Sequence, residues 1–261
     1  MENTQKVGIA GLGAIGSAVG RALIKGIDGL EWVAASDITA NPEFDVPLVS
    51  FDELIEQCDI IIECLPPKVV PELAIKTIKA QKTLILISSC ALLIYPEILD
   101  THKSIHSRII VPSGALTGLD GVKALKKLGI KNSKIASNKK PSGFVGAPYV
   151  EEMGIDLSQI KTRTRIFEGN AIEASKGFPA NVNVAATLSL AGIGAENTIV
   201  EIWADPEALG NSHAIEVSGE FSTIRATVEN MPDPANPKSS MLAAQSIVAA
   251  LEDVNNALVV L

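Results

Sequence analysis

The sequence predicts an α/β protein that begins with a doubly wound parallel sheet and continues with a second α+β domain built on a mixed or antiparallel sheet. In the first part of the chain, apolar strands alternate with amphipathic helices after a glycine-rich turn. Further on, β-rich segments follow one another with few helices between them. We therefore expect a first domain at residues 1–112, a second at 113–238, and a C-terminal helix within 239–261 that docks on the first domain.

The glycine-rich turn has the spacing of a dinucleotide-binding loop. An apolar strand that starts at Lys6 runs into Gly11-Leu-Gly-Ala-Ile-Gly16, and a helix follows. Gly11 allows a tight turn, Gly13 lets the backbone approach a pyrophosphate, and Gly16 lets the helix lie close to the sheet. Free N–H groups at the start of this helix suit phosphates, which predicts a Rossmann domain. The candidate cofactor contacts in the loop are Gly11, Gly13, Ala14 and Ile15.

An acidic residue follows the second apolar segment. Asp37 lies 21 residues beyond Gly16, where a carboxylate can accept hydrogen bonds from both ribose hydroxyls of NAD. No Arg or Lys occurs between Asp37 and Lys68, so nothing nearby in the sequence could hold a 2′-phosphate. NAD is therefore favoured over NADP, which remains possible. The alternative interpretation is an aspartate that only caps its strand.

The other strands of the first domain are short apolar runs. We expect strands at 30–36, 60–62, 83–87 and 107–112, and helices at 51–56, 69–80 and 96–102. Leu65 and Pro66 follow one of these strands and Ala91 follows the next, at the carboxyl edge along which a dinucleotide would pass. These three residues are further candidate cofactor contacts.

The second domain is expected to start near residue 113. The pattern predicts strands at 134–139, 161–168, 198–204, 213–218 and 223–229, and helices at 120–128, 180–191 and 239–251. Asn181 and Asn183 lie on the otherwise apolar helix 180–191, where a buried amide must find hydrogen-bond partners. Those partners are either a nicotinamide carboxamide or the fold itself.

Composition and charge exclude several classes of function. With a net charge of −8 and 4% aromatic residues, the chain has neither a basic surface nor stacking platforms for nucleic acid. Its apolar runs are shorter than the ~20 residues of a membrane span. The N-terminus leads directly into the first strand without a signal peptide, so we expect a cytoplasmic protein. Cys58, Cys64 and Cys90 lack C-x-x-C pairing and a neighbouring histidine, so we expect reduced cysteines and no metal.

Polar residues at three places in the chain are candidates for chemistry or metal binding. His213 stands where a loop enters a strand, which suits either a general acid/base in an interdomain cleft or a cap of that strand. His102 and His106 are four residues apart but have no third ligand, so we interpret them as surface residues. The segment Asn236-Pro-Lys-Ser-Ser240 either binds a carboxylate or simply caps the last helix through Ser239.

Five motifs together resemble the L-aspartate dehydrogenase family. They are Gly11-Leu-Gly-Ala-Ile-Gly16, Ser113-Gly-Ala-Leu116, Phe178-Pro-Ala-Asn-Val-Asn-Val-Ala-Ala186, Asn211-Ser-His213 and Asn236-Pro-Lys-Ser-Ser240. The resemblance covers nearly the whole chain. It implies NAD(P)-dependent oxidation of L-aspartate to iminoaspartate, which either hydrolyses to oxaloacetate and ammonia or feeds quinolinate and NAD biosynthesis.

The resemblance also implies roles for single residues. His213 would be the active-site acid/base, and Ala115 and Asn183 would contact the cofactor. The candidate substrate-binding residues are Asn211, Lys238, Ser239 and Ser240.

The chain departs from the family pattern in two places. Ser88-Ser-Cys-Ala91 replaces the usual glycine after the fourth strand, which puts Cys90 near the expected cofactor, where it could alter nicotinamide placement or substrate choice. Ser239-Ser240 stands in place of Thr-Ser. The alternatives are a related enzyme for another amino or imino dicarboxylate and a non-catalytic NAD-binding sensor. In every case we expect a small-molecule partner and a homo-oligomer, with a dimer favoured.

Overall fold

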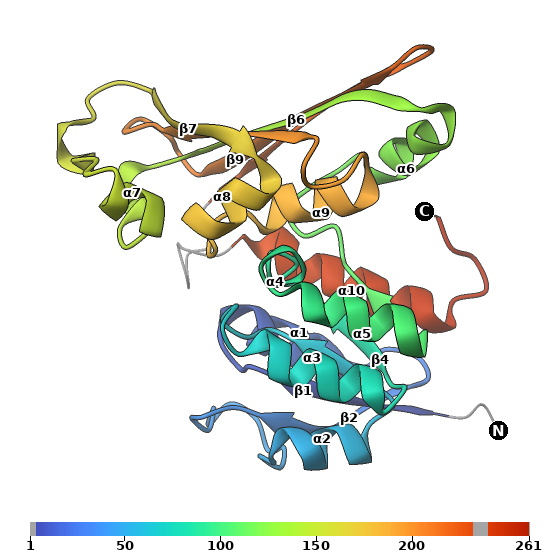
Figure 1. Ribbon diagram of the computed structural model, residues 1–261. Helices are drawn as coiled ribbons and strands as arrows, with labels where there is room; N and C mark the ends of the chain where they lie inside the picture. Colours follow the sequence, from blue (N-terminus) through green and yellow to red (C-terminus); the bar gives the residue numbers. More distant parts are fainter. Residues whose placement is uncertain (1–3, 232–239, 261) are drawn as a thin grey trace. The chain divides into compact units, whose positions relative to one another are not determined.

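The protein is described by a computed structural model that covers residues 4–231 and 240–260. The chain divides into two compact units (Figure 1). The first unit combines residues 1–112 with 243–261, and the second comprises residues 113–242. The last helix of the chain therefore belongs largely to the first unit.

The first unit contains a five-stranded sheet with the order β2-β1-β3-β4-β5, in which all neighbouring strands are parallel. The strands are β1 (Gln5–Ala10), β2 (Leu30–Ser36), β3 (Ile60–Glu63), β4 (Thr83–Leu86) and β5 (Ile109–Ile110). The helices are α1 (Ala14–Lys25), α2 (Phe51–Gln57), α3 (Val70–Lys79), α4 (Ala91–Ile94), α5 (Pro96–Ile105) and α10 (Met241–Asn255). The strand order reverses at β1, so the sheet has the switch point at which open α/β sheets bind nucleotides.

The sheet of the first unit is covered by helices on both faces. Ile60, Ile61 and Ile62 are all buried because both faces of the parallel sheet are covered. One face packs against α1 and α10, and Ile247 and Leu251 of α10 join the same apolar cluster as Val7 and Ile9 of β1. In the other layer, α3 contacts both α2 and α5.

The second unit contains a mixed five-stranded sheet with the order β10-β9-β6-β8-β7. Only β6 and β8 pair in parallel. The strands are β6 (Ile130–Lys139), β7 (Thr164–Asn170), β8 (Thr198–Ala204), β9 (Asn211–Gly219) and β10 (Thr223–Asn230). The helices are α6 (Leu119–Leu128), α7 (Pro148–Glu152), α8 (Ala171–Gly177) and α9 (Asn183–Ala191), with 3₁₀ turns at Pro141–Phe144 and Leu157–Gln159.

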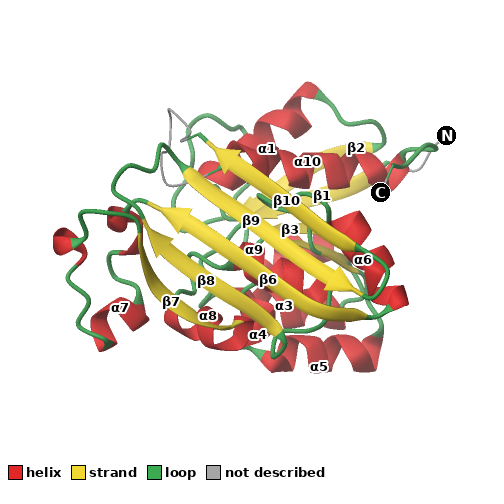
Figure 2. Ribbon diagram, turned by 90° about the horizontal axis from the view of Figure 1, so that it is seen from above, coloured by secondary structure: helices red, strands yellow, loops and turns green. Residues whose placement is uncertain are grey.

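One face of this mixed sheet is covered by helices. Figure 2 shows α8 and α9 behind the strands, and α6, α8 and α9 all contact the sheet. The alternation along β9 agrees, because Ile215 and Val217 are buried whereas Ala214 and Glu216 are exposed. The parallel first sheet and the mixed second sheet confirm the predicted fold class.

Several predicted elements differ from the structure. The strand predicted at 107–112 contains only β5, because two residues pair with β4 at the edge of the sheet. The helix predicted at 180–191 begins at Asn183, because Asn181 lies in a turn in which its N–H donates to the Phe178 carbonyl. Helices α4, α7 and α8 were not predicted, and α4 begins at Ala91, where a loop was expected. Helix α8 carries a capping box between Asn170 and Glu173 that its sequence contains.

Candidate active site

The glycine loop after β1 is shaped by its three glycines. Gly11 has a φ of +94°, and a Cβ there would lie 2.4 Å from the Cys64 carbonyl oxygen. A Cβ on Gly16 would lie 1.8 Å from the Gly11 carbonyl oxygen. A Cβ on Gly13, in contrast, would meet no atom within 4 Å, and Gly13 is exposed. The fold itself therefore requires Gly11 and Gly16, whereas Gly13 leaves open the surface in front of α1.

The N-terminus of α1 fits the phosphates of a dinucleotide. Gly13 is the N-cap, no side chain caps the helix, and its first turn carries no acidic residue. The loop is held in place by Ser17, whose hydroxyl donates to the Leu12 carbonyl at 2.7 Å. Uncapped N–H groups and the positive end of the helix dipole favour an anion at this position. Ala14 and Ile15, in the first turn, are half-buried.

Asp37 lies beside this loop at the end of β2. Its Oδ2 accepts from the Leu12 N–H at 2.5 Å, and its Oδ1 accepts from the Thr39 N–H at 3.0 Å. Each carboxylate oxygen can accept a second hydrogen bond, so the half-buried group can still receive ribose hydroxyls. The structure thus brings Gly11, Gly13 and Asp37 to one edge of the sheet, as a nicotinamide dinucleotide requires.

Glu63 is a residue of this edge that the sequence analysis did not select. It ends β3 and is completely buried. Its Oε1 accepts from the Leu65 N–H at 2.6 Å, and its Oε2 accepts from the Ser88 N–H at 3.0 Å. Burial raises the pKa of this carboxyl to about 7, although these hydrogen bonds oppose the shift. Glu63 therefore ties the loop after β3 to the loop after β4, and the available signal was an acidic residue at the end of an apolar strand.

The other candidate cofactor residues of the first unit lie on these two loops. Pro66 is exposed and Leu65 is half-buried. Ala91 is completely buried in the first turn of α4, and its N–H donates to the Ser88 carbonyl. Cys90 is also buried, and desolvation raises the pKa of its thiol to about 12, so the thiol is neutral. Contacts of these residues with a cofactor stay predictions.

His213 lies inside the second sheet rather than at a strand end. It is the third residue of β9, it is 5% exposed, and it pairs directly with Ser137 of β6. Its Nδ1 and the Ser137 Oγ are hydrogen-bonded at 2.9 Å. Burial first, and then the nearby charge of Lys139, lower the pKa of His213 to about 3. The imidazole is therefore neutral at neutral pH. Because His213 is the third residue of β9 rather than the residue at its start, the interpretation as a strand cap is wrong.

Lys139 is, like Glu63 and Ser137, a residue of the candidate site that was not predicted from the sequence. It ends β6 two residues beyond Ser137, so the two side chains project from the same face of the strand. Its Nζ donates to Asn181 Oδ1 at 2.9 Å. Desolvation lowers the pKa of this partly buried ammonium to about 8. The sequence gives no direct signal for this placement, because the position depends on the pairing of β6 with β9.

The other predicted cofactor- and substrate-binding residues of the second half of the chain are spread over β9, α9 and the segments before α6 and α10. Asn211 starts β9 opposite Asn230 of β10, and Ser240 donates to Asn230 Oδ1 at 2.7 Å. Asn183 is the first residue of α9 and is half-buried, and Ala115 is 7% exposed. The predicted contacts Lys238 and Ser239 lie outside the described residues.

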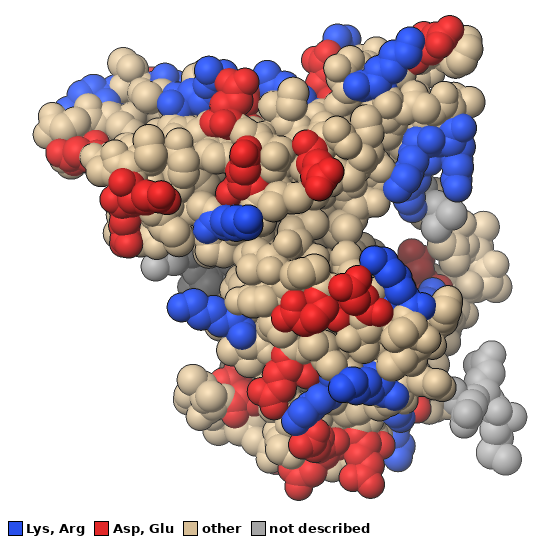
Figure 3. Space-filling model, viewed as in Figure 1, with Lys and Arg blue, Asp and Glu red and all other residues tan. Residues whose placement is uncertain are grey.

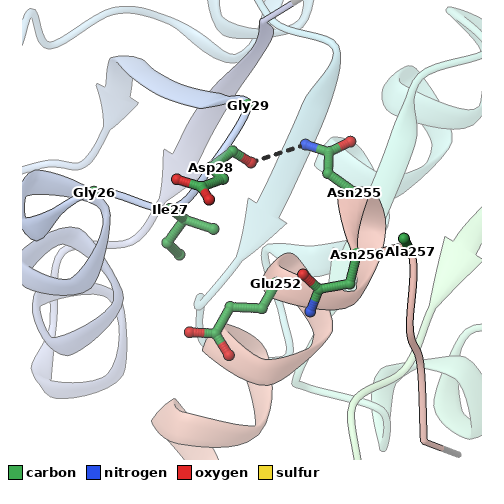
Figure 4. Close-up of a pocket in the computed structure, with 8 residues that line it drawn as sticks. All are labelled: Gly26, Ile27, Asp28, Gly29, Glu252, Asn255, Asn256 and Ala257. Carbon is green, nitrogen blue, oxygen red and sulfur yellow. Dashed lines mark hydrogen bonds between the residues drawn. The ribbon is translucent and has the colours of Figure 1, made fainter. Parts of the chain in front are cut away.

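A separate cavity of about 600 Å³ lies in the first unit, between the turn from α1 to β2 and the end of α10. Figure 4 shows its lining, in which Asn255 donates to the Asp28 carbonyl at 3.1 Å. The turn precedes β2, so the cavity lies at the amino edge of the sheet, opposite the glycine loop. The contact attaches the end of α10 to the first unit.

Surface charge, helix length and possible metal ligands bear on the binding partners of the protein. Figure 3 shows acidic and basic side chains interspersed on the face that it displays. Within the described parts of the chain, no helix is long and apolar enough to cross a membrane. Over the same residues, no group of three or more His, Cys, Asp and Glu side chains is placed to hold a metal ion.

Comparison with known proteins gives consistent matches. The family described as "Aspartate dehydrogenase, C-terminal" matches residues 120–254. An L-aspartate dehydrogenase of Bordetella bronchiseptica is 39% identical over 95% of this chain and 94% of its own length. One of Methanosarcina mazei is 38% identical over 96% of this chain and 97% of its own.

A solved structure agrees with these matches. The crystal structure of aspartate dehydrogenase from Thermotoga maritima superimposes with a TM-score of 0.75 and 29% identity, covering 98% of this chain and 99% of that one. The predicted resemblance is confirmed, and the chain belongs to the L-aspartate dehydrogenase family.

Proposed function

We propose that this protein oxidises L-aspartate to iminoaspartate with a nicotinamide dinucleotide as hydride acceptor, and that NAD is the preferred form. The relatives named L-aspartate dehydrogenase support the substrate. The observation that carries the chemistry is His213, a neutral and almost completely buried imidazole that is oriented by a hydrogen bond to Ser137. Such a group can move a proton to and from an amine.

The proposed proton transfer uses the second nitrogen of the imidazole. When Nδ1 carries the proton and donates to Ser137 Oγ, Nε2 has a free lone pair. Nε2 takes the proton of the substrate ammonium, directly or through one water, which leaves a neutral amine on Cα. A nicotinamide dinucleotide held by the first unit would supply the hydride acceptor for Cα. Once it has released this proton to solvent, His213 assists the attack of water on the imine, which releases ammonia and oxaloacetate unless the imine is used directly in NAD biosynthesis.

The residues of the first unit would hold the cofactor. The N–H groups at the start of α1, with Gly13 in front, suit the pyrophosphate. Asp37 would accept the ribose hydroxyls, and its charge would disfavour a 2′-phosphate, which supports NAD over NADP. We further assign cofactor contacts to Leu65, Pro66, Ala91, Ala115 and Asn183, and substrate contacts to Asn211, Lys238, Ser239 and Ser240.

Two further expectations concern the protein as a whole. We place it in the cytoplasm, and we expect a homodimer whose contact uses the mixed sheet of the second unit. Figure 2 shows no helix in front of this sheet, and Ile199 of β8 is 45% exposed. Light scattering of the purified protein measures the oligomeric state.

The test of the proposed function is reduced-nicotinamide absorbance in parallel reactions with L-aspartate, D-aspartate, L-glutamate, L-malate and no substrate. Turnover with L-aspartate alone is the expected result. A signal only with another substrate would move the assignment to a related enzyme. No turnover in any reaction, together with measurable NAD binding, would favour a sensor.

A further inference from the structure

The polar residues around His213 form a row across three strands of the second unit. Directly opposite residues of paired strands share a face, as do residues two positions apart on one strand. His213 is opposite Ser137, and Asn211 is opposite Asn230. The last pair between β6 and β9 is Asn138 with Ser212, and Lys139 and Asn211 are the next residues along the two strands. Asn230, Asn211 and Lys139 therefore lie side by side at one end of the sheet, next to His213 and on its face.

Lys139 brings an uncompensated positive charge to this face. Its one hydrogen-bond partner in the described chain is the neutral amide of Asn181, and no carboxylate of these residues forms an ion pair with it. An ammonium that is partly removed from water without a counter-ion is costly. Among the described residues, Lys139 therefore lacks a counter-ion.

Asn230 offers a second unused donor. Its Oδ1 accepts from Ser240, but its buried Nδ2 has no hydrogen-bond partner in the part of the chain that the structure describes. A buried N–H group without an acceptor is unfavourable, and native structures seldom contain one. An anion with two oxygens can satisfy both an ammonium and an amide donor.

We propose that Lys139 binds a carboxylate of the substrate, with Asn230 as a second donor, and that this subsite selects amino dicarboxylates. The proposal rests on the proposed function and names the residue that recognises the acidic group. Asn181 orients the ammonium, while Asn211 lies between the two donors. The bound carboxylate neutralises Lys139 and so removes the charge that disfavours protonation of His213. Substrate binding thereby makes His213 a stronger base at the moment a proton must be accepted.

The test compares Lys139→Met with Lys140→Met, its exposed neighbour and matched control. Lys139→Met should raise the KM for L-aspartate about 10- to 100-fold, the range expected for a lost charge-assisted hydrogen bond. The KM for NAD should not change, and kcat should change less than KM. Lys139→Arg should raise the KM for L-aspartate much less than Lys139→Met does, because it keeps the cation. Lys140→Met should leave all constants unchanged.

Amides of the substrate identify the carboxylate that is bound. L-Asparagine lacks the side-chain carboxylate and the α-amide of aspartate lacks the other one. The amide that lacks the bound group should show the same KM in the wild type and in Lys139→Met. Equal effects of Lys139→Met on aspartate and on both amides would overturn the proposal, as would an unchanged KM for aspartate.

A binding measurement separates this proposal from the proposed function. Succinate has two carboxylates and no amine, so it tests anion binding without turnover. Calorimetric titration of the wild type and of Lys139→Met with succinate, in the presence of NAD, should show 10- to 100-fold weaker binding to the variant, roughly matching the change in KM. If the wild type fails to oxidise aspartate but this difference persists, the proposed function fails and the subsite stands. Equal succinate affinity in both proteins overturns the subsite.

Discussion

The candidate ligand-binding surfaces of the two units are built by opposite means. The glycine loop of the first unit presents backbone N–H groups, with the Asp37 carboxylate beside it, while the buried Glu63 carboxylate holds the neighbouring loops through backbone N–H groups. The polar face of the second unit presents side chains from paired strands, with Lys139 as its cation and His213 as its neutral base. The first arrangement requires glycines because the backbone itself is the ligand-binding surface. The second requires a strand register because separate side chains must meet.

The largest expected effect concerns the second unit. His213→Ala should lower kcat with L-aspartate roughly 10²- to 10⁴-fold, since it removes the acid/base group. The affinity for NAD, measured by calorimetry, should stay within about twofold, because the glycine loop lies in the other unit. Ser137→Ala is the milder companion variant, which keeps the imidazole and removes only its hydrogen bond. An equal loss of NAD affinity in His213→Ala would make His213 a structural residue.

A second prediction concerns Glu63 and pH. Its pKa is about 7 in the folded protein against an ordinary value of 4.5, so the folded state binds the extra proton between these values. The contribution of Glu63 to the free energy of unfolding therefore falls by about 3 kcal/mol as pH rises from about 5 to 8. Glu63→Gln should lack this decrease. Urea unfolding, followed by Trp32 fluorescence in a Trp203→Phe background, measures it, and parallel pH profiles of the two proteins would contradict the buried-carboxyl account.

The third prediction compares two glycines of the same loop. Gly13→Ala should fold with an unchanged Tm in the absence of cofactor, because its Cβ meets no protein atom, yet bind NAD about 10- to 100-fold more weakly. Gly16→Ala should lower the Tm of the cofactor-free protein, because its Cβ collides with the Gly11 carbonyl oxygen. Thermal melts with and without NAD separate the two effects. Unchanged NAD affinity in Gly13→Ala would place the pyrophosphate elsewhere.

The smallest expected effect concerns the choice between NAD and NADP. Asp37→Asn keeps an acceptor for the Leu12 N–H but removes the charge. It should raise the KM for NAD by about 10-fold and leave the KM for NADP unchanged or lower. Steady-state kinetics with both cofactors measures the ratio. Equal weakening of both would show that Asp37 supports only the loop.

The contrast between the units also explains what the sequence could predict. Gly11, Gly13, Gly16 and Asp37 are separated by short, regular spacings, because a single strand–turn–helix unit and the next strand hold them. Ser137 and His213 are 76 residues apart and meet only through the pairing of β6 with β9, which single-sequence patterns do not determine. His213 was therefore predicted from its type and its motif, while its partners Ser137 and Lys139 were missed.

The boundary errors have a related cause. Helix 180–191 was predicted from its apolar composition, but Asn181 is held outside the helix by a turn and by its bond to Lys139. Tertiary contacts of this kind override local propensity. Glu63 could have been selected as an acidic residue at the end of an apolar strand, but the loops that it joins could not be predicted, because they meet only when β3 and β4 pair.

The most direct test of the proposed oxidation of L-aspartate is to follow the hydrogen on its Cα. The protein is incubated with L-aspartate deuterated at C2 and with NAD, and the reduced cofactor is analysed by mass spectrometry. Each cofactor reduced by the wild type should carry one deuterium, and His213→Ala should form at least about 100-fold less reduced cofactor over the same time. Reduced cofactor without deuterium, or no reduction by the wild type, would contradict the proposed oxidation.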